Sequence, residues 1–231
     1  MTLRSDLNEH VAAIFADSWS ARDGQVVPAA EDVQLGNDAV KLQGTVLYAD
    51  MAESTLLVDQ YKPHFAAEIY KAYLHCAAKV IRSESGEITA YDGDRIMAVF
   101  IGSTKNTSAA RAALKLNWCR THIINPAIKK QYPETTYAVK HTVGVDASAL
   151  WVARTGVRGA NDLVWVGRAA NHAAKLCGLS SEYPTWITGT VYDAMRDEVK
   201  TSDGRSMWEK RLWTAMGNRV VYRSDWTWRV D

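Results

Sequence analysis

Residues 45–55, TVLYADMAEST, are the stretch from which both the fold and a candidate site can be predicted. The apolar run Val46–Ala49 predicts a buried strand, and this strand ends at the carboxylate of Asp50. A tight turn over Met51–Glu53 follows, and Ser54-Thr55 begins a helix. An acid beside a helix N-terminus offers oxygen ligands to a hard cation and free backbone N–H groups to an anion. Strands also end in Asp as ordinary turn chemistry, so the stretch needs independent support.

A second stretch, residues 87–101 with the sequence EITAYDGDRIMAVFI, supplies that support. Two strands, Glu87–Tyr91 and Arg95–Ile101, flank an Asp-Gly-Asp turn, and Asp-Gly between β-rich runs is a strong hairpin signal. If the hairpin lies beside the first strand, Asp94 reaches the same end of the sheet as Asp50. Two carboxylates that converge at strand ends can hold one or two divalent cations. The alternative is that the acids of the hairpin only form its turn.

Composition restricts the class of protein. The chain has 231 residues, of which 47% are hydrophobic and 23% charged, enough for one well-buried domain with an appended element. The net charge of +1 gives no electrostatic reason to expect nucleic acid or an anionic membrane as a partner. The three cysteines have no metal-binding spacing. No apolar run resembles a signal peptide or a membrane span, so we expect a cytoplasmic protein.

The order of predicted elements indicates an α+β fold. A helix with one apolar face is expected over residues 6–21 and must bury that face on the domain or on a second subunit. Before the middle of the chain we expect a linker (23–39), a helix broken at Pro63 (54–82) and a helix capped by Asn106 or Thr107 and ended by Pro126 (106–124). After it we expect strands (136–147, 150–153, 163–166, 185–188, 207–214, 219–223), a loop or arm (155–162) and a short helix (191–196). The order βαββαβ, with additional C-terminal β elements, is that of a ferredoxin-like core.

A third motif completes a resemblance to a known family. The run GRAANHAAKL, residues 167–176, predicts a helix that begins after Gly and carries an Asn and, four residues later, a Lys. Together with the two stretches above, it resembles the catalytic domain of class III nucleotidyl cyclases. The match covers residues 43–224, which leaves residues 1–42 as an N-terminal helix and linker and residues 225–231 as a C-terminal tail.

The resemblance implies a reaction and its cofactors. In this family the 3′-hydroxyl of a nucleoside triphosphate attacks its own α-phosphate, and pyrophosphate leaves. Two divalent cations, Mn²⁺ or Mg²⁺, would be held by Asp50 and Asp94, with the Met51 carbonyl as a further ligand. The triphosphate would lie against the backbone N–H groups of Ala52, Glu53, Ser54 and Thr55.

The resemblance also implies a homodimer with active sites at the interface, because the third motif comes from the opposite subunit in this family. Asn171 would fix the ribose, and Lys175 lies where the family usually has the arginine that stabilises the transition state. Lysine keeps the charge but lacks the planar fork of arginine, which Arg158 or Arg168 could supply. The alternatives are a solvated surface role for Lys175 and a local backbone bond for Asn171.

The positions that read the base depart from the purine-specific pattern. Members that select a purine have a polar pair at the positions of Ala90 and Val164, and both residues here are apolar. The aromatic residues Tyr48, Tyr91 and Trp165 could narrow the pocket toward a pyrimidine. Arg95 could donate to O4 of uracil, but it is equally suited to an exposed position or to the phosphates.

The compact, stand-alone domain with its Trp-rich C-terminus resembles the pyrimidine cyclases of bacterial Pycsar anti-phage systems, which make cUMP or cCMP for a separate cyclic-nucleotide-sensing effector protein. The favoured hypothesis is therefore a uridylate cyclase that acts on UTP. The alternatives are a cytidylate cyclase, an adenylate or guanylate cyclase with an atypical base pocket, and a catalytically silent cyclase-homology domain that only dimerises or binds a nucleotide.

Overall fold

The computed structural model describes residues 2–230. The chain forms two compact units. The first combines the chain up to Gln43 with Ala149–Gly167, and the second combines Gly44–Ser148 with the chain from Arg168 onward. No helix within residues 2–230 has both the length and the apolar character that a membrane crossing requires.

The second unit is a layer of helices on a sheet, and its strand order is β10-β11-β7-β5-β2-β4-β3. The elements up to α4 are β2 (Asp38–Ala52), α2 (Ser54–Gln60), α3 (Pro63–Ser83), β3 (Glu87–Asp92), β4 (Arg95–Phe100) and α4 (Lys105–Cys119). They are followed by α5 (Asn125–Gln131), β5 (Lys140–Val157), α6 (Arg168–Leu176), β7 (Thr185–Thr188), α7 (Gly189–Ala194), the small hairpin β8–β9 (Thr201–Ser202, Arg205–Ser206), β10 (Glu209–Trp213) and β11 (Arg219–Ser224). The predicted βαββαβ order is therefore present, with further strands after it.

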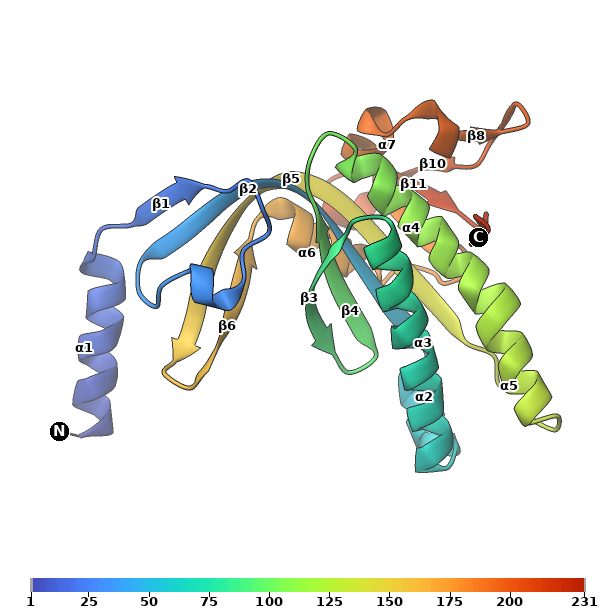
Figure 1. Ribbon diagram of the computed structural model, residues 1–231, viewed down its shortest axis with the longest axis horizontal. Coiled ribbons are helices and arrows are strands. Elements are labelled where there is room, and N and C mark those ends of the chain that lie inside the picture. Colours follow the sequence, from blue (N-terminus) through green and yellow to red (C-terminus); the bar gives the residue numbers. More distant parts are fainter. Residues whose placement is uncertain (1, 231) are drawn as a thin grey trace. The chain divides into compact units, whose positions relative to one another are not determined.

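The core of this unit lies between the sheet and the paired helices α3 and α4, which lie side by side and both pack on β4 (Figure 1). From the strands, Leu47, Ala49 and Ile96 contribute side chains with 0% exposure. From the helices, Tyr73 and Leu114 fill the same cluster. The predicted break at Pro63 is confirmed, because α2 ends at Gln60 and Pro63 begins α3.

The predicted end of the second long helix is wrong. Pro126 does not stop it, because a π-helical turn over Arg120–Ile124 leads from α4 into α5, where the proline occupies a first-turn position that needs no N–H donor. The predicted cap is also wrong, because α4 begins after Thr104. Asn106 is instead buried, and its Oδ1 accepts a hydrogen bond of 2.8 Å from Thr45 Oγ1.

The first unit contains a hairpin where the sequence predicted a loop. Strand β5 continues to Val157 and pairs with β6 (Ala160–Val166) through a two-residue turn, and β1 (Ser20–Asp23) pairs in parallel with the start of β2 (Figure 1). Gly156 has a φ of 109° and accommodates the backbone of Ala160 and Asn161, which leaves no room for a Cβ. The glycines that suggested a loop thus shape a tight hairpin.

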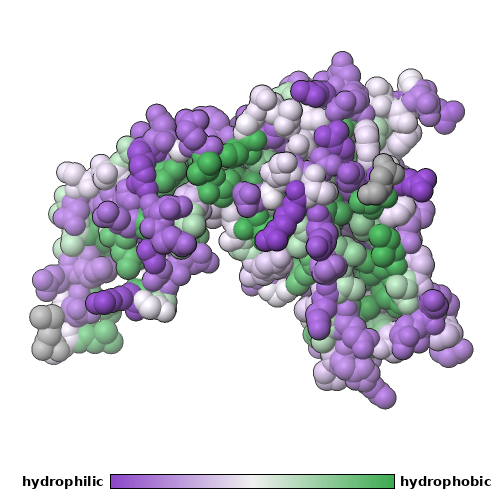
Figure 2. Space-filling view, viewed as in Figure 1, coloured by the Kyte–Doolittle hydropathy of each residue, from purple (hydrophilic) through white to green (hydrophobic). Residues whose placement is uncertain are grey.

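Helix α1 (Leu3–Ala16) also differs from its predicted environment. None of its residues is buried within the described chain, and its large apolar side chains Leu7 and Phe15 are 53% and 85% exposed. Figure 2 shows hydrophobic surface interspersed with hydrophilic surface along this helix. Of the two surfaces expected to cover this face, its own domain does not do so, and burial on a second subunit stays a prediction.

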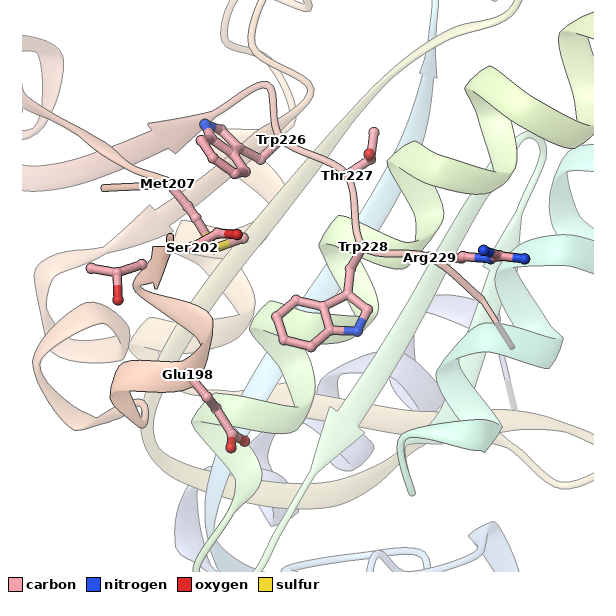
Figure 3. Close-up of a pocket in the computed structure, with 8 residues that line it drawn as sticks. Glu198, Ser202, Met207, Trp226, Thr227, Trp228 and Arg229 are labelled. Atoms are coloured by element: carbon pink, nitrogen blue, oxygen red, sulfur yellow. The ribbon is translucent and has the colours of Figure 1, made fainter. Parts of the chain in front are cut away.

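The C-terminal segment after β11 packs against α4. The Asn117 side-chain amide donates to the carbonyls of Asp225 and Trp226 at 3.0 and 2.9 Å, and the Trp228 N–H donates to the Leu114 carbonyl at 3.1 Å. Figure 3 shows Trp226 and Trp228 on this segment beside a cavity of about 260 Å³. The segment is thus fixed to the helix layer through both backbone and side chains.

A buried histidine on β5 predicts that the stability of the fold depends on pH. His141 on β5 is 0% exposed, neither ring nitrogen has a hydrogen-bond partner within residues 2–230, and its ring meets Tyr73 edge-on at 5.7 Å. Burial, aided by the charge of Arg120, lowers the pKa of His141 to about 3. The unfolded chain, with a histidine pKa of about 6.5, binds more protons between these values, so stability is complete above about pH 6.5 and falls as the pH drops toward 3.

We expect this one group to remove about 1.4 kcal/mol of unfolding free energy per pH unit in that range. His141→Phe keeps a ring against Tyr73 and removes the titrating group. Denaturant midpoints at pH 7 and pH 4 should therefore differ less in the variant than in the wild type. Parallel losses in the two proteins would contradict the neutral, buried state of His141.

Candidate active site

Asp50 lies near the end of β2 and is paired with the neighbouring strand. Its register partner on β4 is Arg95, and Arg95 Nη2 donates to Asp50 Oδ2 at 2.7 Å. The Asp50 side chain is 20% exposed and the Arg95 side chain 36%, so the ion pair lies at the surface of the sheet's end rather than in the core. The aspartate raises the pKa of the Arg95 guanidinium further above its usual range. Only one carboxylate oxygen of Asp50 takes part in this pair.

Asp94 lies in the turn directly before Arg95, next to Asp50 across the ladder. Its Oδ2 is buried and has no hydrogen-bond partner within residues 2–230, a situation that a cation would relieve. Both aspartates also act on one buried group. Burial chiefly raises the pKa of the Tyr73 phenol, and the charges of Asp50 and Asp94 add to the effect.

The donors at this end of the sheet fit a divalent cation. The described residues contain no group of three or more His, Cys, Asp or Glu side chains that could enclose a metal ion. Mg²⁺ and similar cations do not require such a group, because they bind one or two carboxylates and complete their shells with substrate phosphates and water. The orphaned Asp94 oxygen beside the half-engaged Asp50 carboxylate matches that mode.

The turn after Asp50 has an uncommon backbone. Glu53 adopts the left-handed conformation with a φ of 62° and is the residue from which α2 begins. A residue other than glycine in this region is held there by its surroundings, and such residues are frequent at ligand sites. The Glu53 carboxylate is bound by Lys140 Nζ at 3.1 Å. The predicted triphosphate residues Ala52–Thr55 thus lie directly beside Asp50 on a rigid turn.

Asn171 and Lys175 share the exposed face of α6, as their four-residue spacing predicts. Lys175 Nζ has a single polar contact, at 3.8 Å, to Met216 Sδ. The opposite face of the helix is buried in the second unit. Both side chains are therefore free to meet a second molecule.

The two arginines considered as substitutes for Lys175 have different environments. Arg168 Nε donates to Asp146 at 3.1 Å, and its Nη2 donates to the Ala147 carbonyl at 2.6 Å and to Thr190 at 3.2 Å. Its guanidinium is therefore engaged within its own subunit. Arg158 is exposed in the turn of the β5–β6 hairpin of the first unit.

The predicted base-pocket residues fall in both units. In the second unit, Met97 of β4 pairs with Tyr48 of β2 on one side and with Ala90 of β3 on the other. The guanidinium carbon of Arg95 lies 6.0 Å from the centre of the Tyr48 ring. In the first, Val164 and Trp165 lie on β6, paired with Ala153 and Val152 of β5.

Residues that the sequence did not single out surround the site. Cys177 Sγ donates to the Tyr48 carbonyl at 3.3 Å, and burial raises the pKa of its thiol to about 12, which makes it a packing group rather than a nucleophile. The buried Tyr137 hydroxyl has no partner within residues 2–230, and burial raises its pKa. On α6, His172 Nδ1 lies 3.1 Å from the buried Asp146 carboxylate. No local pattern identifies these residues, because each depends on a partner distant in sequence.

Proteins of similar sequence share the whole length of this chain. A protein of Xanthomonas perforans named uridylate cyclase is 52% identical over 232 residues, which is 100% of both chains. One of Burkholderia cepacia with the same name is 48% identical over 232 residues and 100% of both chains. A third, from a Rhodovulum strain, is 36% identical over 99% of this chain and 98% of that protein. The chain matches no family model.

Solved structures share the fold at lower identity. The guanylyl cyclase Cya2 has a TM-score of 0.68 and 15% identity, over 82% of this chain and 94% of that one. The adenylyl cyclase CyaB from P. aeruginosa has a TM-score of 0.62 and 18% identity, over 84% of this chain and 96% of that one. The predicted class III cyclase fold is therefore confirmed.

Proposed function

The chain belongs to the uridylate cyclase family, and we propose that it converts UTP into 3′,5′-cyclic UMP and pyrophosphate. The observation that carries this proposal is the 52% identity to a uridylate cyclase along the complete chain. The site supports it, because Asp50 pairs across the ladder with Arg95, the residue after Asp94, beside the turn that begins α2.

The proposed roles of the metal-site residues follow from that arrangement. Asp50, Asp94 and the Met51 carbonyl hold two divalent cations, Mn²⁺ or Mg²⁺. When bound, these cations supply positive charge to the attacking oxygen and to the phosphates. The backbone of Ala52, Glu53, Ser54 and Thr55 orients the β- and γ-phosphates, and the left-handed Glu53 keeps this turn in one shape.

The second half of the site comes, in this proposal, from another copy of the chain. Asn171 holds the ribose and Lys175 offsets the charge that develops on the α-phosphate. Support comes from their exposure on one face of α6 and from the internal engagement of Arg168, which leaves Lys175 as the available cation of this helix. The protein is thus proposed to act as a homodimer with two sites at its interface.

Tyr48, Ala90 and Arg95 of the second unit are proposed as base-pocket residues from their place at the end of the sheet. Val164 and Trp165 of β6 are proposed as base-pocket residues from the resemblance to the cyclase family. Ala90 and Val164 are too apolar to hydrogen-bond a purine edge. Arg95 lies beside Tyr48 and donates from a side chain that is 36% exposed, so it is suited to O4 of uracil.

The wider role is proposed by analogy with the pyrimidine cyclases of Pycsar systems. Cyclic UMP would be a second messenger that a separate effector protein senses during phage infection, in the cytoplasm where UTP is made. Residues 43–224 would be the catalytic domain. Cells that carry the cyclase and an effector protein that senses cyclic UMP should lose phage protection when Asp50 is replaced by Ala, and protection that survives the substitution would exclude this role.

The activity itself is tested by incubating the protein with Mn²⁺ and each of the four nucleoside triphosphates and identifying the products by mass. We expect cyclic UMP from UTP and much less product from CTP, ATP and GTP. Cyclic CMP as the main product would favour the cytidylate alternative, and no product from any triphosphate would indicate a silent domain.

The same assay tests the role of Arg95. Arg95→Ala should lower the preference for UTP over CTP, measured as the ratio of kcat/KM values, by roughly 1–3 kcal/mol because the donor to O4 is lost. The ratio removes any general effect of freeing Asp50 from its ion pair, since both substrates share the metal site. Equal losses with UTP and CTP would assign Arg95 to the phosphates or the metal site instead.

A further inference from the structure

The buried carboxylate of Asp146 connects three elements, namely its own strand β5, the strand β7 and the helix α6. It is 0% exposed, and its Oδ1 accepts from Thr188 Oγ1 on β7 at 2.5 Å. On α6, Arg168 Nε and His172 Nδ1 each lie 3.1 Å from its Oδ2, and Arg168 Nη2 lies 3.3 Å from Oδ1. Its two partners on α6, Arg168 and His172, are four residues apart and therefore lie on one face of the helix.

A buried carboxylate that only filled space would lower the stability of the fold. A buried carboxylate must be paired and hydrogen-bonded to offset its desolvation, and apolar residues of similar size often stabilise a fold equally well. What an ion-pair network adds is a defined geometry, because its hydrogen bonds are directional whereas apolar contacts are not. The structure therefore suggests that the orientation of α6 matters.

The helix itself has few features that fix its rotation. Four of its nine residues are alanine, and three of these, Ala169, Ala170 and Ala173, form most of its buried face. Helix and strand are in close contact, since a Cβ at Gly144 of β5 would lie 2.1 Å from the Ala173 carbonyl. Small side chains let a helix approach a strand closely but interlock little, so the large apolar contact of this helix is Leu176 at its end, which packs with Trp186 and Trp213.

Asn171 and Lys175 lie on the other, exposed face of the same helix. Their side chains extend from a helix of nine residues, so a small rotation of α6 displaces both of their polar ends together. Misplacement of a catalytic group by about 1 Å costs up to roughly 100-fold in rate.

We propose that Asp146 is a positioning residue for the cyclase reaction: through Arg168 and His172 it fixes the rotation of α6, and thereby presents Asn171 and Lys175 to the substrate of the second copy. This inference rests on the proposed function. Asp146 itself contacts neither substrate nor cation.

Asp146→Asn tests the proposal, because it keeps the shape and removes the charge that holds both Arg168 and His172. We expect kcat for UTP to fall about 10- to 100-fold, with the KM for UTP changed less than threefold. The matched control is Thr188→Val, which removes one hydrogen bond to the same carboxylate and leaves the α6 contacts intact. It should lower the melting temperature but keep kcat within about twofold. If Asp146→Asn does not fold, Arg168→Gln breaks the same clamp at a side chain that is 37% exposed, and it should show the same split.

Mixed dimers provide a readout that loss of stability alone does not produce. An Asp146→Asn subunit should restore activity when mixed with an Asp50→Ala subunit, because one site then combines intact metal ligands with an intact α6. It should not restore activity with a Lys175→Ala subunit, because each site then has one defective α6.

Three results would overturn the proposal: full activity of Asp146→Asn, a change in KM alone, or recovery with Lys175→Ala instead of Asp50→Ala. Failure of the wild-type protein to cyclise any triphosphate would instead refute the proposed function, so the two failures are distinguishable.

Discussion

Asp50→Asn and Asp94→Asn are each expected to reduce UTP cyclisation by about 1,000-fold or more, the largest effects predicted for this chain. Loss of one ligand from a two-cation site removes several kcal/mol of transition-state stabilisation, and each 1.36 kcal/mol corresponds to about tenfold in rate. The amide keeps the size of the carboxylate, so the fold should be retained. Cyclic UMP formation at saturating Mn²⁺ measures the effect, and a Mn²⁺ titration of the purified variants measures the loss of cation affinity independently of turnover.

The β3–β4 hairpin contains a residue that serves as a matched control for these substitutions. Asp92 lies on β3 opposite Arg95, is exposed, and is two residues from Asp94. Asp92→Asn removes a charge of the same sign from the same turn without removing a proposed ligand, and its activity should stay within about threefold of wild type. If Asp92→Asn is as damaging as Asp94→Asn, the effect is one of general charge, and the assignment of the metal ligands is wrong.

The second large effect concerns the two halves of the site. Asn171→Ala and Lys175→Ala should each lower kcat by about 100-fold or more, because each removes a group that contacts the ribose or the reacting phosphate. Equal amounts of Asp50→Ala and Lys175→Ala subunits should recover about a quarter of wild-type activity, since half of the dimers are mixed and each has one intact site.

The recovery must depend on subunit exchange. Cross-linking the dimers of each variant before mixing should abolish it, and cross-linking after mixing should preserve it. If mass measurement demonstrates mixed dimers but the activity of the mixture does not recover, each site lies within one chain.

How far the sequence predicts this structure depends on the range of the interactions involved. The strand that carries Asp50, the helix break at Pro63 and the hairpin turn before Arg95 were predicted correctly, because each is decided by residues a few positions apart. The predicted end of that strand at Asp50 was wrong, because β2 continues to Ala52. Pro126 was misread because a proline in the first turn of α5 continues a helix after a π turn as readily as it ends one. The Gly-rich loop was misread because its glycines belong to a close hairpin.

The network around Asp146 was beyond prediction for a different reason. Its partners Arg168 and Thr188 are 22 and 42 residues away, and no periodicity relates them. A pattern of apolar residues predicts that a position is buried but not which group it meets there. For the same reason no pattern in the sequence predicts that His172 lies against this carboxylate.

The ion pair between Arg95 and Asp50 couples the binding of the cation to the binding of UTP. A cation held by Asp50 and a uracil read by Arg95, as proposed, would each compete with this 2.7 Å contact, so each ligand would free the residue that the other needs. Thermodynamic linkage then requires that the cation raises the affinity for UTP by the same factor as UTP raises the affinity for the cation. Since a partly exposed ion pair is worth at most about 1 kcal/mol, this factor is about fivefold or less. Discrimination against CTP is therefore expected to sharpen as the concentration of free Mn²⁺ rises, and kcat/KM ratios that do not vary with Mn²⁺ would show the two sites to be independent.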